Sequence, residues 1–227
     1  MPYFDYYYLV LIVPTLILSL AAQILVKSTF NKYSKVKSSK GISGKDAAAL
    51  LLKTNEIGDV AIEEVNGNLT DHYDPGSKVL RLSQPVYENT SIAAIGVAAH
   101  ETGHAIQHAR KYGPLGLRSA LVPAANIGSS IGPWLAVIGL IASIPFLIDA
   151  GIILFAAAVL FYLVTLPVEF NASSRAIAIL RSNSVLSEEE LVGVKKVLTA
   201  AALTYVAAAL GAVMNLLRLI LLRRNRN

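Results

Sequence analysis

The sequence predicts a mainly α-helical integral membrane protein, with about four transmembrane helices and a small α+β part exposed to water. Hydrophobic residues make up 54% of the 227 positions and charged residues only 15%, against about 45–50% and about 25% in soluble domains. The apolar residues gather in four long stretches, and basic residues lie beside them, as in membrane proteins. The net charge of +5 is therefore explained by basic residues that flank membrane segments. Membrane lipid is an expected partner, and no nucleic-acid binding is expected.

Each of the four apolar stretches approaches the length that a bilayer requires, which is near 20 residues. They cover residues 8–26, 121–147, 151–168 and 198–222. Asp149, beside Pro145 and Gly151, marks a tight loop between the second and third stretches. These two stretches are therefore expected to form a transmembrane hairpin.

The first stretch is interpreted as a retained anchor, because its N-terminal flank MPYFDYYY lacks the Lys or Arg of a secretory signal. Lysines are frequent in residues 27–53, and the positive-inside rule places that segment in the cytoplasm and the N-terminus outside. The basic C-terminal tail disagrees with this rule if the last stretch crosses once. Either the tail is an exception, or the last stretch bends or lies along the inner surface. The basic residues of the tail are Arg218, Arg223, Arg224 and Arg226.

The chain is thus divided into five regions. They are an N-terminal transmembrane anchor (1–26), a cytoplasmic α+β part (27–117), a transmembrane helical hairpin (118–168), a cytoplasmic helical part (169–197), and a C-terminal membrane helix with a basic tail (198–227). In the last cytoplasmic part, Ser187 and Glu190 match a capping box at a helix start.

The α+β part is expected to begin with a helix over KDAAALLLKTN, capped by Ser43. Three short strands are expected at 59–65, 69–74 and 78–83. The dipeptide Asn66-Gly67 is typical of tight turns and predicts a hairpin between the first two strands. A long helix should then begin near Ser91 and end by Gly113-Pro114.

That long helix contains His100-Glu101-Thr102-Gly103-His104, an H-E-x-x-H sequence. Residues four apart lie on one face of a helix, so both imidazoles can reach one Zn²⁺. The Glu101 carboxylate, next to the first ligand, can act as general base toward a water on the metal. His108 lies too far along the same helix to bind the same ion, which leaves it a supporting, surface or substrate-contacting position.

A catalytic zinc needs a third protein ligand and one position open for water. The candidates are His72 and the acidic residues, of which Glu169 is the strongest. It follows the third apolar stretch in LPVEFNASSRA, where Pro167 marks the point at which the membrane helix ends or is redirected. A glutamate at that place is costly unless it is paired or bound to a metal. The hairpin starts after the H-E-x-x-H helix and returns at Glu169, so both reach the same membrane surface.

The chain resembles the neutral zinc metallopeptidases of bacterial membranes, the YugP-like family, over almost its whole length. The resemblance lies in LTDHYDPGSKVLRLS, AAHETGHAIQHA, LPVEFNASSRAIAIL and KKVLTAAALTYVAAAL. More distantly, the chain is similar to HtpX and the CAAX prenyl proteases, which are membrane gluzincins. These resemblances imply a gluzincin-like α+β domain, one zinc per chain held by His100, His104 and Glu169, and Glu101 as the base.

The HtpX-like pattern has an aspartate four residues after the third ligand, but this chain has Ser173 there. Asn171 or Ser173 is the expected substitute for supporting a ligand histidine. In gluzincins the strand before the motif helix commonly borders the cleft and pairs with an extended peptide. His72 and Tyr73 would then lie near the scissile bond and stabilise the oxyanion. Arg175 is a weaker candidate for a contact with an acidic group or a substrate carboxylate.

We therefore expect a multi-pass zinc metalloendopeptidase of the prokaryotic plasma membrane, with its active site facing the cytoplasm. Its substrates would be peptides or membrane proteins whose peptide bonds lie near the membrane surface. Two alternatives remain from the sequence. One is a zinc-binding membrane protein without protease activity, packed through the small residues Gly128 and Gly132. The other is a zinc hydrolase that acts on a non-peptide substrate.

Overall fold

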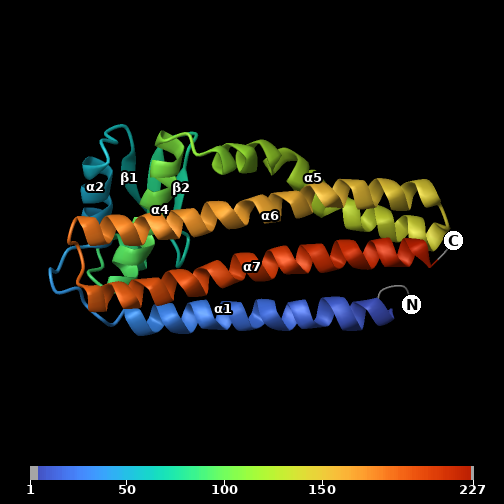
Figure 1. Ribbon diagram of the computed structural model, residues 1–227, viewed down its shortest axis with the longest axis horizontal. Coiled ribbons are helices and arrows are strands. Elements are labelled where there is room, and N and C mark those ends of the chain that lie inside the picture. The colour runs from blue at the N-terminus through green and yellow to red at the C-terminus, as the bar shows by residue number, and fades with distance from the viewer. Residues whose placement is uncertain (1–4, 226–227) are drawn as a thin grey trace. The chain divides into compact units, whose positions relative to one another are not determined.

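The computed structural model describes residues 5–225, and its residues form two compact units. One unit consists of Met1–Gln23, Gly116–Pro167 and Leu203–Asn227, and we call it the helical unit. The other consists of Ile24–Leu115 and Val168–Ala202, and we call it the mixed unit because it contains the sheet. Figure 1 shows the helices and strands of both units, with labels on the longer helices and on β1 and β2. The sequence had indicated a mainly α-helical membrane protein with a small α+β part, and this fold class is confirmed.

Within residues 5–225, four helical segments are long and apolar enough to cross a membrane: Tyr8–Tyr33, Gly113–Ala142, Pro145–Ser182 and Glu188–Arg224. The first comprises a short π-helix (Tyr8–Ile12) followed by α1 (Val13–Tyr33). The others are α5 (Gly113–Ala142), α6 (Pro145–Ser182) and α7 (Glu188–Arg224), and all three contribute residues to both units.

Within the helical unit, α5 and α6 form the expected hairpin. The chain reverses around Ser143, whose φ of 59° is left-handed, and α6 starts at Pro145. The loop expected around Asp149 is therefore misplaced, since Asp149 already lies in α6. Gly128 and Gly132 face α6 so closely that a Cβ on either would collide with the backbone of Leu154 or Phe155. The small residues of α5 thus serve packing inside the chain.

One end of the helical unit is held by ion pairs between the N-terminal segment, α6 and α7. Arg218 of α7 donates to Asp5 at 2.7 Å, and Arg223 donates to Asp149 at 2.9 Å. The Arg218 guanidinium also lies 5.3 Å from the Tyr8 ring centre. α7 is one unbroken helix as far as Arg224, so no loop interrupts the last apolar stretch. Arg226 lies outside the described residues.

The mixed unit contains a three-stranded sheet in the order β1-β3-β2, with β1 (Ala61–Val65), β2 (His72–Asp74) and β3 (Val79–Ser83). β1 pairs with β3 in parallel, and β2 pairs with β3 in antiparallel orientation. The hairpin predicted at Asn66-Gly67 is therefore wrong. The physical reason is that β3 is the most buried and apolar strand, so it takes the centre of the sheet and leaves β1 and β2 at the two edges.

Between α1 and α5, the mixed unit contains the helices α2, α3 and α4. α2 and α4 begin at the cap residues that the sequence predicted. α2 (Gly44–Thr54) has Ser43 as N-cap in a capping box with Asp46. α3 (Gln84–Tyr87) is a single turn, and α4 (Ile92–Ala109) is capped by Ser91 and ends before Gly113, as predicted. The capping box of Ser187 and Glu190 at the start of α7 is also present.

α4 is the centre of the mixed unit. Its face with Ile95 and Ala99 packs against Leu180 of α6 and Val194 of α7, and its other face packs against Leu80 and Leu82 of the sheet. α6 continues unbroken through Pro167 into this core, so the membrane helix does not end at that proline. The continuation brings the residues after Pro167 against α4.

Candidate metal centre

The two motif histidines project from the middle of α4, where the helix is almost completely buried. The run before and after them is rich in Ala and Gly, which lets neighbouring elements approach the backbone. The His100 and His104 rings lie on the same side of α4, with centres 4.8 Å apart and planes nearly perpendicular. The spacing of four residues therefore does bring two imidazoles together, as helix geometry requires.

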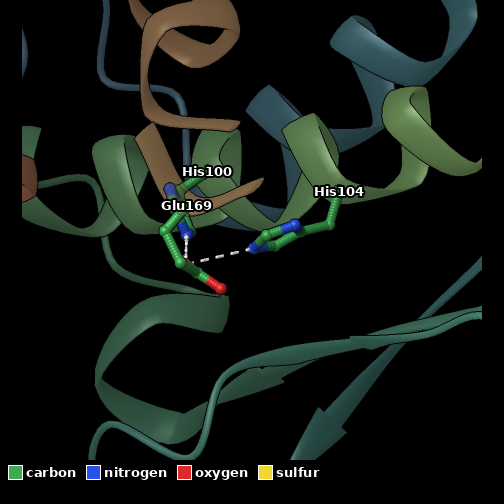
Figure 2. A group of neighbouring side chains, drawn as sticks. All are labelled: His100, His104 and Glu169. Carbon is green, nitrogen blue, oxygen red and sulfur yellow. Dashed lines mark hydrogen bonds and ion pairs between the residues drawn. The ribbon is translucent and has the colours of Figure 1, made fainter. Parts of the chain in front are cut away.

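Glu169 of α6 meets these two imidazoles. Its Oε2 lies 3.2 Å from Nε2 of His100 and 3.5 Å from Nε2 of His104. Figure 2 shows the three side chains converging, the imidazoles from α4 and the carboxylate from α6. One ligand atom from each residue can be chosen so that all three lie within 4.8 Å of one another. The Glu169 side chain is only 2% exposed.

A backbone contact beside the motif brings α6 this close to α4. A Cβ on Gly103 would lie 2.7 Å from the carbonyl oxygen of Ala172. Only a glycine leaves room at that point, and Ala172 follows Glu169 by less than one helical turn. The glycine inside the H-E-x-x-H sequence therefore allows the third residue of the group to approach.

The second ring nitrogen of each imidazole, Nδ1, also has a hydrogen-bond partner. Nδ1 of His100 lies 3.1 Å from Oγ of Ser173, and Nδ1 of His104 lies 3.0 Å from Oε1 of Gln107. Both rings thus present Nε2 to Glu169 and are held from behind through Nδ1. This is the way in which metal-bound histidines are commonly oriented in proteins.

Glu101 is 9% exposed and lies next to His100 in the chain. Its Oε2 accepts a hydrogen bond of 3.1 Å from the backbone N–H of Tyr73 in β2. β2 pairs with β3 on its other side, so this N–H belongs to the outer edge of the sheet. The sheet edge and the motif glutamate therefore meet directly.

The remaining residues singled out from the sequence divide into two groups. Asn171 and Arg175 lie behind the site, where Asn171 Oδ1 accepts from both Gln107 Nε2 at 3.0 Å and Arg175 Nε at 2.7 Å. On the β2 side, the Tyr73 hydroxyl contacts Nδ1 of His108 at 2.8 Å. His72 is exposed at the start of β2, where its Nδ1 contacts the carbonyl oxygen of Thr70.

The charges around the site favour a cation. Burial works against protonation of His104, but the Glu169 carboxylate, with help from the Glu101 charge, raises the pKa of this imidazole above its ordinary value. The negative groups that attract a proton to this ring would equally attract a metal ion. Burial also raises the pKa of Asp71, against its two hydrogen bonds with Ser83.

The donor atoms suit zinc. Two imidazole nitrogens and one carboxylate oxygen are a common ligand set of catalytic zinc, and the chain has no cysteine that would favour a thiolate site. Gln107, which contacts His104, is a residue of this group that the sequence did not single out. Its position three residues after His104, on the same side of a helix, was the available signal.

Comparisons with known proteins agree with this geometry. A family model described as "Putative neutral zinc metallopeptidase" matches residues 8–224. The chain is 51% identical over 218 residues to the "Putative membrane protease YugP" of Bacillus subtilis (strain 168), which covers 96% of this chain and 97% of that protein. No solved structure matches the chain. The resemblance inferred from the sequence motifs is therefore confirmed, and the chain belongs to the family described as "Putative neutral zinc metallopeptidase".

Proposed function

We propose that this protein is a membrane-anchored zinc metalloendopeptidase, with His100, His104 and Glu169 as zinc ligands and Glu101 as general base. The observation that carries the proposal is the convergence of two Nε2 atoms and a buried carboxylate oxygen beside the H-E-x-x-H glutamate. The family and the relative's name support the same reaction class.

Zn²⁺ bound by this set supplies a Lewis acid that polarises a peptide carbonyl and acidifies a water molecule. The rest of the reaction falls to residues of the chain. Glu101 takes the proton from the attacking water and delivers it to the leaving amine. The Tyr73 N–H donates to Oε2 of Glu101, which holds the carboxylate in place beside the two histidines.

The substrate is inferred to be a peptide chain that lies close to the cytoplasmic membrane surface. The outer edge of β2 faces Glu101 through the Tyr73 N–H, and an extended peptide can add to such an edge by backbone hydrogen bonds. Cytoplasmic loops of membrane proteins and membrane-associated peptides have the required access. His72 and the Tyr73 hydroxyl stay candidates for stabilising the oxyanion.

A paired assay of the purified full-length protein tests the mechanism. We would measure bound zinc and the cleavage of an unstructured protein for the wild type, Glu101→Gln and Glu64→Gln. Glu64 is an exposed residue of β1 and undergoes the same chemical change. Glu101→Gln should keep its zinc and lose about 10²–10⁴-fold in cleavage rate, whereas Glu64→Gln should match the wild type. Cleavage by Glu101→Gln at the wild-type rate would overturn the proposed mechanism.

The same assay separates the alternatives. A zinc-binding scaffold would hold zinc without cleaving any substrate, and a hydrolase of another bond would cleave an ester and leave the protein substrate intact. The scaffold is disfavoured by the position of Glu101, since a structural zinc site has no use for a carboxylate beside its ligand. Gly128 and Gly132, its proposed packing surface, are already in contact with α6.

We also propose that the metal centre faces the cytoplasm and that the C-terminal tail lies on the outer side. The lysines after the first apolar stretch support this orientation by the positive-inside rule. The objection from the tail is weakened, because Arg218 and Arg223 are each paired with a carboxylate. The chain has no cysteine, so single cysteines can be labelled in intact cells with an impermeant maleimide. Asn225→Cys should react in intact cells, and Lys53→Cys only after the membrane is opened; the reverse pattern refutes this orientation.

A further inference from the structure

Gln107 is a fully buried residue that connects the His104 imidazole with α6. Its Oε1 lies 3.0 Å from Nδ1 of His104, and its Nε2 lies 2.8 Å from the carbonyl oxygen of Val168. A backbone carbonyl can only accept, so the amide nitrogen of Gln107 has to point to Val168 and the amide oxygen to His104. That oxygen also can only accept. Nδ1 of His104 therefore carries a hydrogen, which leaves Nε2, on the side of Glu169, as the nitrogen that can bind a metal.

The side chains around the Gln107 amide nitrogen give the amide the same orientation. Arg175 Nε can only donate, and it donates to Asn171 Oδ1 at 2.7 Å. The same Asn171 oxygen accepts from Gln107 Nε2 at 3.0 Å. The Arg175 guanidinium lies over the Tyr112 ring, 5.8 Å from its centre. The orientation of the Gln107 amide is thus fixed both by the backbone of α6 and by side chains.

We propose that Gln107 is a positioning residue of the metal centre, which fixes the tautomer and ring orientation of His104 and ties this ring to the backbone beside Glu169. This role rests on the proposed function, because a histidine needs a fixed tautomer when it is a metal ligand. His100 is held differently. Its partner, the Ser173 hydroxyl, can either donate or accept, so it orients the ring without selecting the tautomer.

Three variants of the full-length protein test the role. Gln107→Met keeps the length of the side chain and removes both polar ends. Gln107→Glu keeps an oxygen that accepts from His104, and its protonated form can still donate to Val168. Thr102→Val is the matched control, because Thr102 is fully buried on the same helix and gives up one hydrogen bond of 2.8 Å, to the carbonyl of Ala98.

The measurements are zinc affinity by competition with a chelator and the visible absorption spectrum of the Co²⁺-loaded protein, which reports ligand geometry. Gln107→Met should bind zinc about 10–100-fold more weakly than the wild type and show an altered Co²⁺ spectrum. Gln107→Glu and Thr102→Val should keep the affinity and the spectrum of the wild type.

The outcomes separate this role from the proposed function. If the wild type binds zinc and Gln107→Met binds it equally well, the role of Gln107 is refuted and the metal centre stands. If Gln107→Glu fails as badly as Gln107→Met, or Thr102→Val fails with them, the loss comes from packing and the role is refuted. If the wild type itself binds no zinc, the metal centre is refuted and the role of Gln107 with it.

Discussion

The helical unit contains a partly buried carboxylate and the mixed unit a fully buried one, and the two carboxylates have different kinds of partner. In the helical unit, Asp5 pairs with Arg218, and the two side chains are 18% and 6% exposed. In the mixed unit, Glu169 is 2% exposed and meets the imidazoles of His100 and His104. A guanidinium is always charged and cannot bind a metal ion, whereas an imidazole can give up its proton and bind a metal ion instead.

This difference shows how one residue type can serve two purposes. The Asp5–Arg218 pair carries its own cation and is electrically complete, so it stabilises a buried connection between the N-terminal segment and α7. The group around Glu169 brings two imidazole nitrogens and a carboxylate to one place, with Glu101 as a second negative group close by. Such a group gains by taking up an external cation, because burying uncompensated charge is costly.

Removing the carboxylate of the metal centre should have the largest effect. Zinc at a thousandfold excess over its Kd raises the unfolding free energy of a one-site protein by about 4 kcal/mol, and Glu169→Ala should lose this gain. The measurement is thermal unfolding in detergent with and without zinc, together with bound zinc per chain. A variant that keeps the full zinc-dependent shift shows that Glu169 is not a ligand.

Removing the cation of the helical unit should have a somewhat smaller effect that does not depend on zinc. Arg218→Met removes the charged hydrogen bond to the partly buried Asp5, and the loss of such a bond typically costs about 1.5–3 kcal/mol. Denaturant unfolding in detergent measures this loss, and zinc affinity should stay as in the wild type. Arg224→Met is the matched control, since Arg224 is exposed. Equal losses in both arginine variants contradict a specific role of the pair.

Removing both charges of the helical unit should restore most of that loss. Asp5→Asn combined with Arg218→Met leaves no buried charge to compensate, and such replacements are often neutral within about 1 kcal/mol or stabilising. Unfolding of the two single variants and the double variant completes a mutant cycle. Strictly additive losses would mean that Asp5 and Arg218 do not act as a pair.

The pH dependence of the pair should be the smallest effect. Burial of Asp5 works against its ionisation, but the hydrogen bond and charge of Arg218, together with the hydrogen bond from the Tyr8 backbone N–H, lower its pKa below the ordinary value. The stabilisation is therefore fully present above the unfolded pKa near 3.9 and is lost as the pH falls through the folded value. Unfolding of the wild type at pH 7 and pH 3 should show a loss that the double variant lacks. If the double variant loses the same unfolding free energy between pH 7 and pH 3, the pH dependence comes from other carboxylates.

Local patterns predicted the membrane helices, the caps and most of the metal centre. His100 and His104 were recognisable because a spacing of four residues on one helix fixes their distance. Glu169 was recognisable because a carboxylate directly after an apolar stretch is costly unless it is paired or bound to a metal. The course of α6 past Pro167 was not recognisable, because the packing of its second half against α4 decides it. The same holds for Gln107, whose partners lie far away in the sequence.

The sheet shows where such patterns stop. Asn66-Gly67 favours a tight turn, but turn propensity is local, whereas strand pairing depends on which strand the core buries most deeply. Leu80 and Leu82 are fully buried and draw β3 between its neighbours. The pairing of β1 with β3 was therefore not accessible from the turn residues, although the positions of the strands were.

The close approach at Gly103 makes the motif of this chain stricter than its general form. The general pattern leaves two positions free, but here one of them has to lack a side chain, because a Cβ would meet the Ala172 carbonyl at 2.7 Å. An alanine at that place would push apart the backbones of α4 and α6, and so change the distances from Glu169 to His100 and His104. For this protein, the informative search pattern is H-E-x-G-H, because its glycine allows the close approach of α4 and α6.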